Sequence, residues 1–314
     1  MISLVSGGAG FIGSHLCDFL ISQEHQVICL DNLITGHLEN IRSLLENPAF
    51  QFINTDITQP LPTSLPKVDW IFHLASPASP NTYIKYSFQT IFANTQGTYQ
   101  LLEYARQNQC KFLFASTSEI YGSPLVHPQP ESYWGNVHSY GPRACYDESK
   151  RLGESLIYEF ISKFNVDARI IRIFNTYGPR LNESDGRVVS NFIVQALKSI
   201  PISIYGDGSQ TRSFCYISDL ISGIWAAMRL PKTQGEIFNL GNPTEISIKN
   251  FAQLVLKLVE NTQSKIIFKP LPIDDPICRK PDIAKANRQL NWEPSCALEK
   301  GLIHTIQWYK SRVS

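Results

Sequence analysis

The 314-residue sequence lacks long apolar runs and an excess of charge of either sign. No apolar stretch reaches the roughly 18 residues that a membrane-spanning helix needs. Lys and Arg number 28 and Asp and Glu 27, so the formal charge of +1 gives no electrostatic argument for nucleic-acid or membrane binding. With 43% hydrophobic and 18% charged residues, the composition is that of a soluble globular protein with a substantial core.

Cysteine in paired motifs is also absent. The seven cysteines are scattered, odd in number and free of any Cys-x-x-Cys spacing, which is typical of reduced thiols in a cytoplasmic protein. The histidines show no metal spacing, and we expect His73, inside an apolar run, to lie in the core. Because residues 2–5 already predict a strand, we expect no signal peptide. The cysteines are Cys17, Cys29, Cys110, Cys145, Cys215, Cys278 and Cys296.

A glycine-rich turn follows the first expected strand. After residues 2–5 the chain has three closely spaced glycines and then an amphipathic helical pattern. Glycines let a pyrophosphate approach the backbone, and the N-terminus of the following helix supplies amide donors. Strand, turn and helix in this order are the setting of a dinucleotide site. We therefore predict cofactor contacts from Gly7, Gly10, Phe11, Ile12 and Gly13.

An acid at the end of the next strand predicts which dinucleotide binds. Residues 26–30 form an expected strand that ends in Asp31, 18 positions beyond Gly13. A carboxylate there accepts hydrogen bonds from the ribose hydroxyls and repels a 2′-phosphate. The sequence therefore predicts NAD instead of NADP, with Asn32 assigned to the same site.

Short strands then alternate with helical patterns. Expected strands at residues 50–54, 70–74, 112–115 and 169–174, with a helical pattern at 88–107, predict a parallel sheet with right-handed crossovers. The fold class is therefore α/β, a Rossmann-like doubly wound sheet. Cofactor contacts are expected where these strands end. They are Asp56, for which a turn or helix-capping role is the alternative, Ile57, Leu74, Ala75 and Ser76.

The alternation weakens after residue 174. Helices are expected at 186–198, 219–228 and 251–259, followed by a strand at 266–268 and two closing helices. We predict an NAD-binding domain over residues 1–174 and a smaller, mainly substrate-binding C-terminal lobe over 175–314, with an approximate boundary and some interleaving. The lobe has arginines in turns or at helix starts, where guanidinium groups often meet phosphates or carboxylates. At least two of Arg180, Arg187, Arg212 and Arg279 are expected to face the ligand.

Two further motifs suggest proton chemistry. Tyr146 and Lys150 are four positions apart, so a helix places both on one face. A nearby ammonium and the helix N-terminus would lower the pKa of the phenol, as oxidation of a secondary alcohol requires. Residues 116–119, Ser-Thr-Ser-Glu, follow the 112–115 strand and are unusual as mere packing; helix capping is the alternative, but no helical pattern starts at once.

With these motifs in view, the sequence resembles the extended short-chain dehydrogenase/reductase superfamily. Within it the chain is most similar to the UDP-glucuronate decarboxylase family, also called UDP-xylose synthases. The similarity extends over nearly the whole chain and is far more specific than the glycine turn. The residues that carry it are 73–80, 116–122, 141–150, 172–180, 186–192, 209–219, 239–243 and 279–282.

The resemblance implies a role for each matching residue. Thr117, Tyr146 and Lys150 would remove the C4 hydroxyl proton while NAD accepts the C4 hydride. Ser118 and Glu119 would assist at C5 and the carboxylate; related 4,6-dehydratases have an acidic Asp at the Ser118 position, so a serine favours loss of CO₂ over loss of water. Arg279 would lie near the uronate. Thr176 and Arg187 would lie near the cofactor, and the substrate contacts would be Tyr83, Asn175, Asn191, Tyr205, Arg212 and Arg279.

The implied reaction converts UDP-glucuronate to UDP-xylose through a 4-keto intermediate, with return of the same hydride. Two alternatives use the same scaffold, namely a nucleotide-sugar 4-epimerase and a 4,6-dehydratase. A third alternative, from another class, is a non-catalytic NAD-binding sensor or scaffold. The sequence departs from the family at Phe92-Ala93-Asn94, where Lys-Thr-Asn is expected. A relative that acts on a different uronate is therefore a further alternative.

The partners are expected to be small molecules and a second copy of the chain. Relatives of this kind commonly pair two helices into a four-helix dimer interface. Here the expected helices at 88–107 and 146–164 have apolar or aromatic residues on more than one face, including Tyr99, Leu102, Tyr158 and Phe160. We therefore expect a homodimer that binds a nucleotide sugar, with no metal, membrane or nucleic-acid partner.

Overall fold

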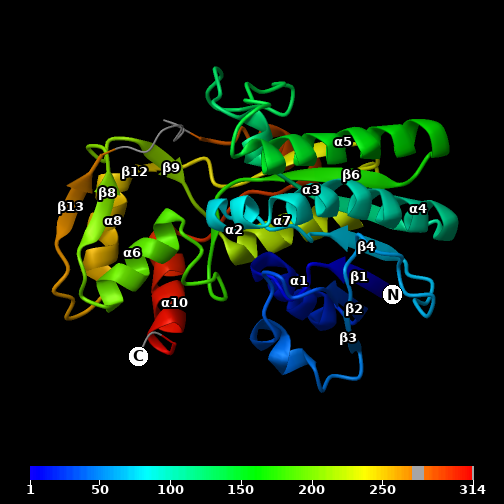
Figure 1. Ribbon diagram of the computed structural model, residues 1–314, viewed down its shortest axis with the longest axis horizontal. Helices are drawn as coiled ribbons and strands as arrows, with labels where there is room; N and C mark the ends of the chain where they lie inside the picture. Colours follow the sequence, from blue (N-terminus) through cyan, green and yellow to red (C-terminus); the bar gives the residue numbers. More distant parts are fainter. Residues whose placement is uncertain (271–278, 313–314) are drawn as a thin grey trace.

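A seven-stranded parallel sheet forms the larger part of the molecule (Figure 1). The computed structural model describes residues 1–270 and 279–312, so Cys278 lies outside the described residues. The strand order is β11-β6-β5-β4-β1-β2-β3, and every neighbouring pair is parallel, which confirms the predicted Rossmann-like sheet. The strands are β1 (Ile2–Ser6), β2 (Gln26–Asp31), β3 (Phe50–Asn54), β4 (Trp70–His73), β5 (Lys111–Thr117), β6 (Ala168–Ile173) and β11 (Ile237–Leu240).

Helices cover both faces of this sheet, because its strands are apolar on both sides. One face packs against α1 (Phe11–Ser22) and α7 (Ile217–Arg229), and the other against α4 (Thr98–Asn108) and α5 (Ala144–Phe164). The helix expected at 88–107 is interrupted. It consists of α3 (Ser87–Phe92), one π-helical turn (Ala93–Gly97) and α4. The remaining elements here are α2 (Pro80–Lys85), α9 (Ala284–Leu290) and the short 3₁₀ helices Leu38–Leu44 and Ser118–Tyr121.

A smaller lobe with its own apolar core lies beside the carboxyl ends of the strands (Figure 1). Its helices are α6 (Val188–Leu197), α8 (Ile248–Leu258) and α10 (Leu298–Lys310). No helix in the described part of the chain is long and apolar enough to span a membrane. Short strand pairs complete the lobe: β8 (Ile202–Tyr205) with β13 (Ile266–Lys269), β9 (Thr211–Ser213) with β12 (Glu245–Ser247), and β7 (Thr176–Tyr177) with β10 (Cys215–Tyr216).

The chain passes between the two parts more than once. β11 belongs to the second half of the sequence, yet it is the edge strand of the large sheet beside β6. α7 and α9 return with it and pack near this edge. The predicted division at residue 174 is therefore crossed by residues 217–240 and 284–290, and the substrate-binding character of the lobe stays a prediction.

Candidate active site

A cavity of about 1010 Å³ lies between the carboxyl ends of the strands and the smaller lobe. Open parallel sheets bind ligands at this edge because the strand-to-helix loops converge there. Every residue that the sequence assigned to cofactor, substrate or chemistry lines this one cavity. The four turn arginines, Arg180, Arg187, Arg212 and Arg279, line it as well. The structure therefore brings the predicted site residues together in one cavity.

The glycine turn lines the part of the cavity where the sequence predicts the cofactor, here called the cofactor end. Gly7 has a φ of +77°, and a Cβ there would lie 2.7 Å from Ala75 Cα. A Cβ on Gly13 would lie only 2.1 Å from Gly7 O, so the turn and the first turn of α1 are in close backbone contact. α1 begins at Phe11 directly after this turn, with its unpaired amide groups at the cavity. A backbone cradle beside a helix N-terminus fits a dinucleotide pyrophosphate.

Asp31 lies at the end of β2 and is held by two backbone groups. Its carboxylate accepts hydrogen bonds from Ala9 N at 2.9 Å and Leu33 N at 2.8 Å. Burial raises the pKa of Asp31, although these two amide donors partly oppose the effect. Each carboxylate oxygen retains a lone pair for a further donor, which fits a ribose diol.

The Asp56 side chain accepts hydrogen bonds from nearby residues and also lines the cavity. Asn32 Nδ2 donates to Asp56 Oδ2 at 3.2 Å, and Asp56 Oδ1 accepts from Thr58 N at 2.9 Å. The second bond is an Asx turn, which is the structural role that the sequence left as an alternative. Asp56 also lines the cavity, and its contact with the cofactor stays a prediction.

The Tyr146–Lys150 pair lies in the first two turns of α5. Both side chains are buried, and Lys150 Nζ lies 6.0 Å from the centre of the Tyr146 ring. Lys150 Nζ donates to Ala115 O at 2.7 Å, and the Tyr146 hydroxyl is hydrogen-bonded to Thr117. The structure therefore brings a phenol, an alcohol and an amine together at one point of the cavity.

The expected lowering of the pKa of Tyr146 is wrong for this structure. Burial raises that pKa, and it outweighs the hydrogen bond from Thr117 and the nearby charge of Arg187. Burial also lowers the pKa of Lys150 to about 7, so its ammonium form is itself disfavoured. The sequence argument assumed a permanently charged lysine and neglected desolvation, which acts on both groups.

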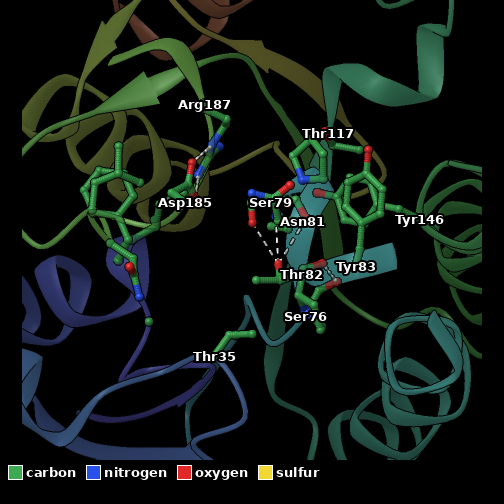
Figure 2. Close-up of a pocket in the computed structure, with 18 of the residues that line it drawn as sticks. Thr35, Ser76, Ser79, Asn81, Thr82, Tyr83, Thr117, Tyr146, Asp185 and Arg187 are labelled. Atoms are coloured by element: carbon green, nitrogen blue, oxygen red, sulfur yellow. Dashed lines mark hydrogen bonds and ion pairs between the residues drawn. The ribbon is translucent and has the colours of Figure 1, made fainter. Parts of the chain in front are cut away.

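Tyr83 stacks on Tyr146 along one wall of the cavity (Figure 2). The ring centroids are 4.9 Å apart and the planes differ by only 4°. The Tyr83 hydroxyl is buried and has no hydrogen-bond partner within residues 1–270 and 279–312. Because a buried unpaired hydroxyl is costly, this group fits a hydrogen bond to a bound ligand.

Two arginines bracket Glu119 at the sugar end of the cavity. Arg143 Nη2 and Arg279 Nη1 each donate to one of its carboxylate oxygens. Burial alone would raise the pKa of Glu119, but the two guanidinium groups hold it below its ordinary value. Sequence reasoning missed Arg143, although it directly precedes the helix of Tyr146. Its role depends on Glu119, which is 24 positions away along the chain.

Asp147 is a further buried carboxyl group next to this cluster that sequence reasoning also missed. Its side chain does not line the cavity. Its Oδ1 atom is buried and has no hydrogen-bond partner among the residues described. Burial and the charge of Glu119 raise its pKa to about 7, while Arg143 and Arg279 oppose the shift. The net charge of the cluster near neutral pH therefore depends on the protonation of Asp147.

The hydroxyl-rich segment after β5 differs from expectation in one respect. A 3₁₀ helix begins at Ser118, capped by Thr117 Oγ1, which accepts from Glu119 N at 3.2 Å. Capping, the alternative role, is therefore part of what Thr117 does. The tight turn places Ser118 and Glu119 beside each other at the cavity. Ser116 Oγ instead donates to Glu154 Oε1 at 2.5 Å.

The substrate end of the cavity includes residues of the smaller lobe. Arg187 forms an ion pair with Asp185, which sequence reasoning missed, and both lie across the cavity from Tyr83 and Tyr146 (Figure 2). Asn191 Nδ2 donates to Gly186 O at 2.8 Å, and Arg212 Nη1 to Thr211 O at 2.8 Å. These bonds orient polar groups along the cavity wall, where Asn175, Thr176 and Tyr205 also lie.

The departure from the family pattern coincides with the irregular helix. Phe92 ends α3, and Ala93 opens the π-helical turn; both line the cavity. Asn94 Nδ2 donates to Ser149 Oγ at 3.0 Å and so ties the turn to α5. Phe92 and Ala93 make the wall apolar at this point, where the resemblance leads us to expect a lysine and a threonine.

A metal site has no support in the described part of the chain, which contains no cluster of His, Cys, Asp and Glu that could hold an ion. His73 is fully buried, as predicted, between Ser6 Oγ at 2.8 Å and Thr98 Oγ1 at 3.0 Å. Burial lowers its pKa to about 3, so its polar role is to hydrogen-bond within the core.

Comparison with known proteins agrees with this geometry. The chain is 47% identical to UDP-glucuronic acid decarboxylase 1 of Arabidopsis thaliana over 310 residues, 99% of this chain and 70% of that protein. A UDP-glucose 4-epimerase of Thermotoga maritima, solved with UDP-glucose, is 30% identical with a TM-score of 0.91 over all of both chains. A UDP-glucuronic acid 4-epimerase of Bacillus cereus, in complex with UDP-glucuronic acid and NAD, is 32% identical with a TM-score of 0.90 over 99% of each chain. Residues 3–241 match the NAD dependent epimerase/dehydratase family, and the chain belongs to that family.

Proposed function

We propose that this protein decarboxylates UDP-glucuronate to UDP-xylose. The observation that carries the proposal is the placement of Glu119 between Arg143 and Arg279, in the same cavity as the Thr117–Tyr146 hydrogen bond. Guanidinium groups and a phenol that line one cavity would suit a substrate with both a carboxylate and a hydroxyl to oxidise. The name of the curated relatives, UDP-glucuronic acid decarboxylase, supports the same function.

The residues of the glycine turn and the β2 end would hold NAD. Gly7 and Gly13 provide the close backbone approach, and Asp31 would accept the ribose hydroxyls. When bound, the cofactor accepts a hydride from C4 of the sugar and later returns it. Because Asp31 would repel a 2′-phosphate, NAD should bind at least about tenfold more tightly than NADP. Equal affinities in a calorimetric titration would contradict the role of Asp31.

The chain's own residues would control the proton and the developing charge. Tyr146 would take the C4 hydroxyl proton, with Thr117 hydrogen-bonded to it. A ketone at C4 is β to the C6 carboxylate, so loss of CO₂ leaves an enolate at C4 and C5. Hydrogen bonds from Thr117 and the protonated Tyr146 to that oxygen would stabilise the charge. A proton taken up from water at C5, and return of the Tyr146 proton to the C4 oxygen as C4 is reduced again, then give the pentose.

The charge cluster suits a substrate with a second carboxylate. Two guanidinium groups face the single carboxylate of Glu119, and Asp147 has a pKa raised to about 7 by burial. The cluster therefore retains positive charge that a uronate could neutralise and a neutral hexose could not. Arg279 Nε also has no hydrogen-bond partner among the described residues, so its guanidinium retains a donor for a ligand.

One incubation tests the proposal. The purified protein is mixed with UDP-glucuronate, and released CO₂ and the nucleotide product are measured by mass spectrometry. We expect CO₂ and a UDP-pentose. A protein that instead releases water from a neutral hexose nucleotide and ignores the uronate would be a 4,6-dehydratase. A protein that contains NAD but turns over no nucleotide sugar would be a sensor or scaffold.

A second candidate is a 4-epimerase acting on the same uronate. It is favoured by the likeness to the Bacillus cereus UDP-glucuronic acid 4-epimerase, which was solved in complex with UDP-glucuronic acid and NAD. The paired placement of Ser118 and Glu119 has no evident use in epimerisation, so we rank this candidate second. An epimerase would yield a nucleotide sugar of unchanged mass and no CO₂ in the same incubation.

We further propose that the protein is a cytoplasmic homodimer paired through α3, α4 and α5. Tyr99 and Tyr158 are 49% and 68% exposed, whereas Leu102 and Phe160 are buried in the chain's own core. Light scattering at micromolar concentration should give twice the chain mass; a monomer would count against the pairing. The cytoplasmic assignment rests on unpaired thiols and is checked by cell fractionation. Other exposed aromatic side chains on these helices are Phe88, Phe92 and Phe164.

A further inference from the structure

Asn239 is a fully buried side chain that connects three separate segments near the charge cluster. It lies on β11 opposite Arg172 of β6, outside the cavity. Its Oδ1 accepts from the Tyr121 hydroxyl at 2.8 Å. Its Nδ2 donates to Gln129 O at 3.0 Å and to Asp282 O at 3.1 Å. Both amide protons and the amide oxygen are therefore used, and each bond reaches a different part of the chain.

The segments that Asn239 joins include both members of the central ion pair. Tyr121 belongs to the same 3₁₀ helix as Glu119, and Asp282 follows Arg279 by three residues. Glu119 and Arg279 are 160 positions apart in the sequence, so no local structure sets their separation. Asn239 is the side chain that bonds to the immediate surroundings of both.

Gln129 strengthens the attachment of residues 279–282, here called the Arg279 strap. Gln129 N donates to Lys280 O at 2.9 Å, and Asp282 N donates to Gln129 O at 2.9 Å. Lys280 N donates to Gln129 Oε1, also at 2.9 Å. Gln129 is fully buried, so these bonds are shielded from water. The Arg279 strap is thus held against the loop that contains Gln129 on one side and β11 on the other.

The same network reaches the helix of Tyr146 and Lys150. Tyr121 accepts from Arg172 Nη1 at 2.9 Å, and Arg172 pairs with Glu154 of α5 at 2.8 Å. Glu154 lies one helical turn beyond Lys150 and accepts from Ser116, the residue before Thr117. A hydrogen-bonded path therefore joins the proton-transfer residues to the Arg279 strap.

We propose that Asn239 is a positioning residue that sets Arg279 against Glu119 for decarboxylation. The inference deepens the proposed function and rests on it. An ordinary buried asparagine would stabilise the fold without affecting one catalytic group more than another. Asn239 differs because its bonds end within three residues of both members of the Glu119–Arg279 pair. A misplacement of about 1 Å at such a group can lower turnover by about 10²-fold.

The test variant is Asn239→Asp, which keeps the size and the oxygen that accepts from Tyr121. It replaces the Nδ2 donor by an oxygen facing two carbonyl groups, at 3.0 and 3.1 Å in the native protein. We expect kcat for CO₂ release to fall by about tenfold or more, with a change in KM below about threefold. NAD content and the thermal unfolding curve are recorded on the same sample.

The matched control is Asn242→Asp, two residues beyond the end of β11. Asn242 Oδ1 accepts from Thr244 N at 2.8 Å, and an aspartate retains that acceptor. This control should leave kcat and KM unchanged.

A double-variant cycle separates positioning from general stability. If Asn239 acts through Arg279, adding Asn239→Asp to Arg279→Ala should lower kcat by less than about twofold beyond Arg279→Ala alone. An equal fractional loss in both backgrounds would mean that Asn239 does not act through Arg279, and would overturn the inference. So would an unchanged kcat in a folded Asn239→Asp protein that contains NAD.

A second variant decides the matter if Asn239→Asp does not fold. Gln129→Met keeps both backbone bonds to the Arg279 strap but removes the two side-chain bonds of Gln129, from Lys280 N to Oε1 and from Nε2 to Val126 O. It should lower kcat by about threefold or more, and have no added effect with Arg279→Ala. An unchanged kcat would overturn the inference. If the wild-type protein releases no CO₂, the proposed function itself is overturned. If the wild-type protein and Asn239→Asp both turn over normally, only the positioning role is overturned.

Discussion

The two ends of the cavity are built in different ways. At the cofactor end, neighbouring strands of one sheet supply the contacts, and the glycine turn is shaped by backbone packed against backbone, as at Gly13. At the sugar end, Glu119, Arg143 and Arg279 come from three distant segments and are joined by side-chain bonds. The cofactor end should therefore be sensitive to added volume, and the sugar end to changes in charge or hydrogen bonding.

The largest expected effect concerns the proton acceptor between the two ends. Tyr146→Phe should lower turnover of UDP-glucuronate by roughly 10² to 10⁴, because in the proposed mechanism the phenol oxygen takes the C4 proton. The ring stacks on Tyr83, and phenylalanine preserves that contact, so the fold should be retained. NAD content and UDP affinity, measured on the same variant, should match the wild type. Near-normal turnover would remove Tyr146 from this role.

Arg279→Ala tests whether the sugar end acts in chemistry or in binding. Loss of a transition-state contact lowers kcat, whereas loss of a diphosphate contact mainly raises KM. We expect the variant to bind UDP but to lose at least about 10²-fold in saturated turnover on UDP-glucuronate. Normal saturated turnover with a raised KM would make Arg279 a phosphate anchor. The measurement is a full substrate titration followed by mass spectrometry of the product.

Gly13→Ala tests the volume sensitivity of the cofactor end. The added methyl would lie 2.1 Å from Gly7 O and 2.8 Å from Gly8 Cα, both of which are backbone atoms. The turn would have to move, and NAD affinity should fall by at least about tenfold. The matched control is Gly235→Ala, at a positive-φ glycine with nothing within 4 Å of the added methyl. It should cost stability but leave NAD affinity unchanged; equal losses in both variants would refute a specific role for the turn.

The smallest effect concerns the charge balance beside Glu119. Burial raises the pKa of Asp147 from 3.8 to about 7, so the folded protein retains a proton there that the unfolded chain has released. Stability should therefore decrease as pH rises from 3.8 towards about 7. Asp147→Asn is always neutral and removes this penalty. Its Tm relative to wild type should rise by at least about 2 °C between acidic and neutral pH; a constant difference across that range would contradict the shift.

The difference between the two ends of the cavity also explains which features the sequence could predict and which it could not. The glycine turn and Asp31 were predictable because strand, turn and helix are contiguous in the sequence. The residues next to each position are enough to indicate its structural role. Tyr146 and Lys150 were predictable as a pair because helix geometry places them together. Their pKa values were not, because burial depends on the packing of distant segments. The sequence led us to expect a lowered pKa for Tyr146, whereas burial raises this pKa in the folded protein.

By itself, the sequence determined the parallel sheet and the dinucleotide turn. Those features follow from hydrophobic periodicity and from contiguous motifs, which act over a few residues. Only the tertiary structure decided that Arg143 would bracket Glu119 and that Asn239 would join Tyr121 to the Arg279 strap. The physical reason is that hydrogen bonds and ion pairs are directional and short-ranged. Their partners are therefore chosen by the packing of segments up to 160 residues apart, which no local pattern encodes.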